Sequence, residues 1–219
     1  MKGIKLLTTL LLFQLATSSY GQHLEVTLAD ASGAPIEDAV IEVVLPAAIA
    51  SQYAAISEGT IDQVDKEFVP TITTIVAGSK IHFPNSDDIL HHVYSFSPID
   101  TFDIPLYGND VTARFVEEFP LSGVVEIGCN IHDWMLAYIY IAESSKVAIS
   151  DDAGKARIEN LPAGTYPVRV WHARLPRGTE YHMETVTLQN NTVELQVSLD
   201  LERDRRIRRA PTANSNRYR

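Results

Sequence analysis

The stretch Gly128-Cys-Asn-Ile-His-Asp-Trp-Met135 carries a thiol, an imidazole and a thioether on one short segment. Apolar runs with β-branched residues, Val124–Ile127 and Ala137–Ala142, stand on either side of it, so we expect a loop between two strands. Thiolate and thioether ligands favour Cu(I), and imidazole binds copper in both oxidation states. The segment therefore predicts a site for a soft, redox-active metal ion. Zinc is the competing ion, although it rarely uses methionine.

A second segment, Phe83-Pro-Asn-Ser-Asp-Asp-Ile-Leu-His-His-Val-Tyr-Ser-Phe96, has the pattern of a strand, a polar turn and a strand that opens with two histidines. Because side chains alternate across a strand, His91 and His92 point to opposite faces, and only one of them can bind the ion. Two histidines and one cysteine in a plane, with a weak axial methionine, form a blue-copper site. Met135 alone would be core packing and Cys129 alone a buried thiol, so it is their joint occurrence that predicts copper.

The first residues have the pattern of a secretory signal peptide. Two lysines precede an apolar run, Leu6–Leu15, and small residues follow it. The run is shorter than the about 20 apolar residues that a membrane span needs, and no later segment is long and apolar enough. We therefore expect a signal peptide at residues 1–21, no transmembrane segment, and a soluble mature protein in the periplasm that begins near Gln22.

Charge is unevenly distributed along the chain, which has 28 Asp and Glu against 18 Lys and Arg. Seven arginines and one aspartate lie in residues 203–219 and two lysines in the signal peptide, which leaves 27 acidic and nine basic residues between them. An acidic body argues against a nucleic-acid ligand. The arginine-rich tail has almost no apolar residues, so we expect it to be disordered. It suits an acidic or anionic partner, and a solvated tail without a partner is the alternative.

Signals for β-strands run through the rest of the chain and predict an all-β fold, because many short strands with turns between them form sandwiches or barrels. Ala47–Ala55 is the one segment that indicates a short helix. The expected strands are alternating or β-branched runs bounded by turn residues, namely Leu24–Leu28, Ala39–Leu45, Thr71–Val76, Lys80–Phe83, His92–Phe96, Val111–Phe119, Val124–Ile127, Ala137–Ala142, Tyr166–His172 and Thr192–Leu199.

Together the motifs resemble the cupredoxin family of plastocyanin and amicyanin. The resemblance is carried by the strings around the two histidines and by Cys129-x-x-His132-x-x-Met135, which has the short amicyanin-like spacing. More closely, the strings His-His-Val-Tyr-Ser-Phe and Cys-Asn-Ile-His-Asp-Trp-Met are similar to those of bacterial exported proteins labelled "methylamine utilisation protein". The resemblance implies one mononuclear copper ion, as Cu(I) or Cu(II), with His91, Cys129 and His132 as equatorial ligands and Met135 as the axial ligand.

A second resemblance surrounds the first. Val26–Val43 and Ser150–Val170 look like the two halves of a carboxypeptidase-regulatory-like β-sandwich, with Asp-x-x-Gly and Leu-Pro-x-Gly turns. We therefore expect a cupredoxin Greek-key sandwich at residues 47–144, inserted into a small Ig-like sandwich formed by residues 22–46 and 145–202. The alternative is a cupredoxin domain at residues 22–143 next to a separate C-terminal domain.

The resemblance implies an electron carrier that exchanges single electrons with a redox protein, such as a c-type cytochrome or a periplasmic dehydrogenase. A copper carrier that delivers the metal without redox turnover is the alternative, and a structural binding protein whose site stays empty is a third. We do not expect an enzyme, because the sequence shows no Ser-His-Asp set, no phosphate-binding glycine loop and no second cluster of metal ligands.

His92 departs from the cupredoxin pattern, because many members have at this position an asparagine that ties the two ligand loops together. We expect the His92 ring to take over that task and to hydrogen-bond the backbone near Cys129 or Asn130, since such partners orient metal ligands. The alternative is that His92 faces solvent.

Overall fold

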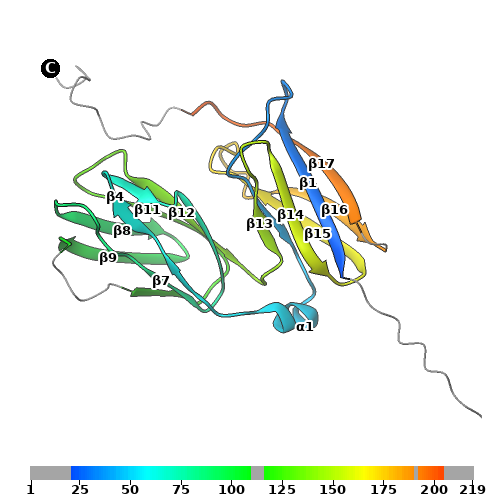
Figure 1. Ribbon diagram of the computed structural model, residues 1–219, viewed down its shortest axis with the longest axis horizontal. Helices are drawn as coiled ribbons and strands as arrows, with labels where there is room; N and C mark the ends of the chain where they lie inside the picture. Colours follow the sequence, from blue (N-terminus) through cyan, green and yellow to red (C-terminus); the bar gives the residue numbers. More distant parts are fainter. Residues whose placement is uncertain (1–20, 110–115, 190–191, 205–219) are drawn as a thin grey trace, which may run out of the picture.

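The structure, a computed structural model, describes residues 21–109, 116–189 and 192–204 and is nearly all β (Figure 1). The expected all-β class is therefore confirmed. The expected signal peptide up to residue 20, and the tail from residue 205, lie outside the described residues.

The strands in chain order are β1 (Gln22–Asp30), β2 (Val40–Val43), β3 (Glu58–Thr60), β4 (Asp62–Val64), β5 (Glu67–Val69), β6 (Ile72–Val76), β7 (Ser79–His82), β8 (His91–Ser97), β9 (Asp100–Tyr107), β10 (Val116–Phe119), β11 (Gly123–Gly128), β12 (Leu136–Ala142), β13 (Val147–Ile149), β14 (Lys155–Leu161), β15 (Gly164–Trp171), β16 (His182–Leu188) and β17 (Thr192–Leu199).

Nine of the ten expected strands overlap described strands over most of their length, and Val111–Phe119 is described only from residue 116, as β10. The expected helix is shorter than its pattern indicated: α1 covers Ala47–Ala50, and a 3₁₀ turn continues it over Ser51–Tyr53. Seven strands, β3, β4, β5, β9, β13, β14 and β16, were not expected. Four of these are only three residues long, which is too short to show alternation.

The amino-terminal strands pair with the carboxy-terminal ones. β1 lies between β14, to which it is antiparallel, and β17, to which it is parallel. The second sheet has the order β13-β2-β15-β16. Alternation along β1 buries Leu24, Val26 and Leu28 in one core that both sheets share, while the residues between them point outward. We propose on this pairing that residues 22–43 and 147–199 form one sandwich, and the expected domain boundaries stay a prediction.

The strands between these two segments form a second group, which lies beside the first in Figure 1. A five-stranded sheet has the order β6-β12-β11-β8-β9, and a three-stranded sheet has the order β10-β7-β3. Large buried side chains from these sheets, among them Phe119 and Ile139, form a core of their own together with Phe83, which follows β7. Cys129 and Met135 belong to this core, so the predicted ligand loop is packed against it.

Aromatic side chains join the two groups. Tyr138 and Tyr140, on the outer face of β12, pack against Trp171 of β15 with ring centroids 5.2 and 6.2 Å apart. Beneath them, the Glu42 carboxylate is 1% exposed and accepts hydrogen bonds from the Tyr140 hydroxyl and the Glu143 backbone N–H, each at 2.8 Å. Arg169 lies 3.6 Å from the same carboxylate. The contact between the groups therefore encloses an ionisable side chain.

Burial raises the pKa of Glu42, and its hydrogen bonds only partly offset that effect. The folded protein therefore holds this proton more tightly than the unfolded chain does, whose glutamate titrates near 4.5. The contribution of Glu42 to the free energy of unfolding is complete below that pH and is lost as the pH rises through the folded pKa.

We expect Glu42→Gln to remove this pH-dependent contribution, so urea unfolding from about pH 4 to pH 8 should show a smaller loss of stability with pH than in the native protein. Parallel pH profiles would contradict the prediction.

Candidate metal centre

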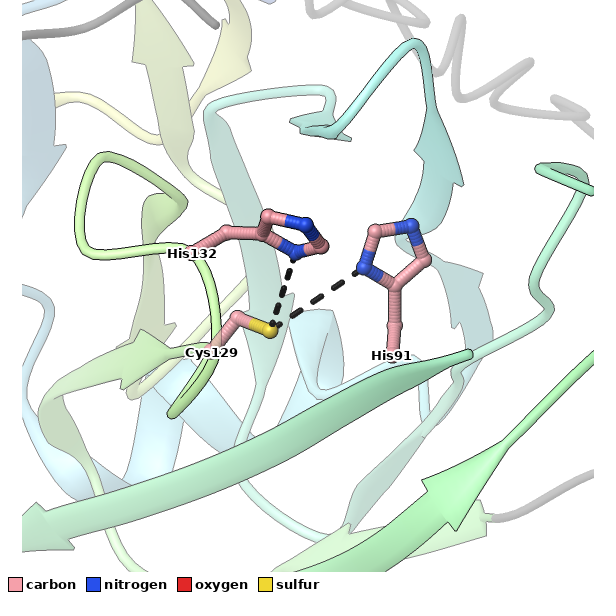
Figure 2. A group of neighbouring side chains, drawn as sticks. All are labelled: His91, Cys129 and His132. Carbon is pink, nitrogen blue, oxygen red and sulfur yellow. Dashed lines mark hydrogen bonds between the residues drawn. The ribbon is translucent and has the colours of Figure 1, made fainter. Parts of the chain in front are cut away.

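Three predicted ligands meet at one end of the second group of strands, although they come from two distant segments. His91 opens β8, Cys129 follows the last residue of β11, and His132 lies in the loop that leads to β12. Figure 2 shows the Nδ1 atoms of both imidazoles directed at the sulfur. The Cys129 Sγ atom is 4.0 Å from Nδ1 of His91 and 3.7 Å from Nδ1 of His132. One ligand atom from each residue lies within 4.8 Å of the others.

These separations fit a metal ion at the centre of the three donor atoms. Metal–thiolate and metal–imidazole bonds of about 2.3 and 2.0 Å place sulfur and nitrogen roughly 3.7 Å apart when the bonds diverge by 120°. Both measured sulfur–nitrogen distances are close to that value. One thiolate with two imidazoles is also a donor set that copper prefers. Among the described residues, these three form the cluster of His, Cys, Asp and Glu side chains that could hold a metal ion.

Backbone hydrogen bonds close the ligand loop into a tight turn. The Met135 N–H donates to the His132 carbonyl at 2.9 Å, and the Cys129 N–H donates to the Met135 carbonyl at 3.3 Å. The Met135 side chain is 2% exposed and packs in the same core as Cys129. The Met135 side chain is therefore held in the core that also contains Cys129, and its role as axial ligand stays a prediction.

Burial is graded across the cluster. His91 is fully buried and Cys129 is 3% exposed, whereas His132 is only half-buried. Burial lowers the pKa of His132, and the nearby His91 and Lys66 lower it further. A lowered pKa favours the neutral imidazole, which is the form that binds a metal ion. The centre is thus enclosed by protein on most sides, with the His132 ring as its contact with the surface.

Asp87 holds the other side of the His91 ring. Nε2 of His91 donates to the Asp87 carboxylate at 2.7 Å, which leaves the Nδ1 lone pair facing the cluster. Burial alone would raise the pKa of Asp87, but hydrogen bonds from His91 and from the backbone N–H groups of Lys66 and Asp65 lower it overall. Asp87 was not among the expected site residues, although a carboxylate four positions before a candidate ligand, on the same polar turn, is a signal that could have identified it.

The expectation for His92 is wrong. Its Nε2 atom bonds the Asp103 carboxylate at 2.7 Å, and its buried Nδ1 atom has no hydrogen-bond partner among the described residues, so the ring bonds no backbone group near Cys129 or Asn130. Alternation along β8 is the reason, since it separates the two histidines and turns His92 away from the ligand loop. The ring is not free in solvent either, because it packs at a tilt against Tyr94 with centroids 5.6 Å apart. His92 therefore lies outside the candidate centre.

No protein-family model and no curated protein matches this chain. Among solved structures, it is similar to the purple cupredoxin from Nitrosopumilus maritimus, with 20% identity over 38% of this chain and 99% of that one, at a TM-score of 0.35. Amicyanin from Paracoccus versutus matches at 19% identity over 47% of this chain and 97% of that one, with a TM-score of 0.35. A copper-containing nitrite reductase from Thermus scotoductus matches at 20% identity and a TM-score of 0.37, over 54% of this chain but only 28% of that one. The matches are cupredoxin-like, whereas a closer relation to methylamine utilisation proteins stays a prediction.

Proposed function

We propose that this protein binds one copper ion through His91, Cys129 and His132, with Met135 as the axial ligand, and that it transfers single electrons between redox partners. The observation that carries the proposal is the buried cluster of one thiol and two imidazoles, with sulfur–nitrogen distances of 3.7 and 4.0 Å. A copper ion there would supply a reversible one-electron couple. The protein supplies donors that the fold already holds together, so they need to move little when the oxidation state changes.

The surface around His132 suits the exchange of electrons. The half-buried His132 ring packs at a tilt against Trp134 with centroids 5.2 Å apart, and the neighbouring Ile131 side chain is 48% exposed. An apolar surface at the edge of a metal centre favours a brief encounter over a small area, below about 1,200 Å² in total. The partner in this proposal is a redox protein, such as a c-type cytochrome or a periplasmic dehydrogenase.

The proposed location is the periplasm, on the strength of the signal-peptide pattern in residues 1–21. Within the described ranges, no helix is long and apolar enough to cross a membrane. We do not propose an enzymatic role, because four protein ligands on one copper ion would leave no position for a substrate.

The test is a titration of the purified metal-free protein with Cu(II) and, separately, with Zn(II). We expect one equivalent of Cu(II) to produce an intense thiolate-to-copper band that disappears on reduction and returns on oxidation over repeated cycles. A colourless protein that binds zinc as tightly as copper would refute the proposal. If the reduced protein instead gives up Cu(I) readily to a chelator and cannot be cycled, delivery of copper is the better description.

A further inference from the structure

A two-residue turn lies against both ligand segments of the metal centre. β4 and β5 form an antiparallel hairpin whose connection is Asp65 and Lys66, with φ angles of 53° and 62°. Positive φ at both positions is the geometry of the tight hairpin turn that matches the twist of the strands. Here it points two successive backbone N–H groups at the Asp87 carboxylate, at 2.6 Å from Asp65 and 2.8 Å from Lys66.

The first link of this turn leads to His91. The Asp87 carboxylate accepts the two backbone N–H groups and also the Nε2–H of His91 at 2.7 Å. The side chains of His91 and Asp87 are 0% and 12% exposed, so water has little access to this pair. A carboxylate with three donors is held firmly in place and fixes the rotation of the ring that it bonds.

The second link leads to the other ligand segment. The Lys66 carbonyl accepts a hydrogen bond from the indole N–H of Trp134 at 2.9 Å. Trp134 lies inside the ligand loop, and its ring packs at a tilt against the ring of His132. One turn therefore bonds the His91 segment through its N–H groups and the Cys129–Met135 segment through its carbonyl.

The hairpin itself is fixed to the body of the protein. The fully buried Gln63 side chain, in β4, donates to the Pro84 carbonyl at 2.9 Å, and the Gln63 carbonyl accepts the Ser86 N–H at 3.0 Å. The Ser86 hydroxyl also donates to Asp62 at 2.7 Å. Because Pro84 and Ser86 precede Asp87 in the chain, the turn and the Asp87 carboxylate cannot move independently.

We propose that Asp65, Lys66, Asp87 and Trp134 form a clasp that sets the separation of His91 from Cys129 and His132 before any metal ion arrives, with Asp87 and Trp134 as positioning residues. The clasp performs the task that the sequence analysis assigned to His92. The proposal rests on the proposed function in so far as the bound ion is copper. The clasp is a property of the chain alone, since all of its bonds are between protein atoms.

The test compares two aspartates that each accept a 2.7 Å hydrogen bond from Nε2 of one of the two adjacent histidines. Asp87→Asn replaces one carboxylate oxygen with an N–H₂ group, which cannot accept all three donors. We expect it to weaken copper binding by about 10–100-fold, as for other groups that orient metal ligands. The control, Asp103→Asn, affects the equally short bond to His92 and should change copper affinity by no more than about twofold.

A second variant tests the other link. Trp134→Phe keeps an aromatic ring beside His132 but removes the N–H donor, and we expect copper affinity to fall by about 2–10-fold, the effect of one hydrogen bond. Trp171→Phe, in the contact between the two groups of strands, is the matched control and should leave the affinity unchanged. The double variant of Asp87 and Trp134 should lose less than the product of the two single losses, because either change releases the same turn.

The spectrum distinguishes positioning from mere stabilisation. In fully copper-loaded Asp87→Asn we expect altered relative intensities of the thiolate-to-copper bands, which an effect on stability alone would not produce. A loaded variant with the native spectrum and the native affinity would overturn the clasp. If the native protein shows no thiolate-to-copper band, the proposed function fails instead. In that case the clasp is tested by the Zn(II) affinity of the same four single variants, because it positions the donors for either ion.

Discussion

Replacing Cys129 with serine is expected to abolish the thiolate-to-copper absorption completely. It should also weaken copper binding by more than about 10–100-fold, which is the loss expected when a residue that only hydrogen-bonds a ligand is removed. Cys129 is the only cysteine in the chain, so no other side chain can supply a thiolate. A serine hydroxyl is a hard donor that stays protonated near neutral pH, whereas copper at such a site favours sulfur. The measurement is a Cu(II) titration followed by visible spectroscopy and competition with a chelator.

Cys129→Ala is the matched comparison, because it removes the ligand without adding a polar group to a buried position. Both variants should lose the band, and urea unfolding of the metal-free proteins shows whether either has lost the fold instead. A band of native intensity in a folded Cys129→Ser protein would mean that the thiolate is not the chromophore. The copper proposal would then have to be abandoned.

The second large effect is expected from truncation. A chain that ends at Ser145 lacks β13 to β17, so β1 loses β14 and β17 together, and β2 loses β13 and β15. Leu24, Val26 and Leu28, which are at most 1% exposed, would then meet water, at a cost of about 1.5–3 kcal/mol for each side chain. Unpaired strand edges with apolar faces promote aggregation. We expect this chain to aggregate, as measured by size-exclusion chromatography.

The control for truncation is a chain that ends at Asp204, which keeps every strand that the structure describes and removes only residues 205–219 of the arginine-rich tail. It should stay monodisperse and bind copper as the full chain does. If the chain that ends at Ser145 is equally soluble and binds copper normally, residues 22–43 do not depend on the carboxy-terminal strands. The alternative division, a domain at residues 22–143 followed by a separate one, would then be correct.

Strands with strong alternation could be predicted because a strand that is buried on one face alternates apolar and polar residues along its local sequence. β1, β11 and β17 overlap the expected ranges for this reason, whereas β12 is buried along nearly its whole length and was expected from its run of apolar residues. β9 was missed because its core side chains are interrupted by Asp103 and Pro105, and β14 because it alternates only Ala156 and Ile158 with polar residues. In both strands the pairing with neighbours outweighs a weak local propensity.

The sequence by itself determined the candidate ligands. Cys129, His132 and Met135 share one loop, so their proximity follows from chain connectivity, and alternation along the strand separates His91 from His92. Only the tertiary structure decided what holds the two ligand segments together. Asp87 and Trp134 both bond the Asp65–Lys66 turn, which lies about twenty residues before Asp87 and about seventy residues before Trp134 in the chain. The parallel pairing of β1 with β17 is likewise a contact between the two ends of the described chain. Such long-range hydrogen bonds depend on how whole sheets pack, and therefore short-range patterns of hydrophobicity do not predict them.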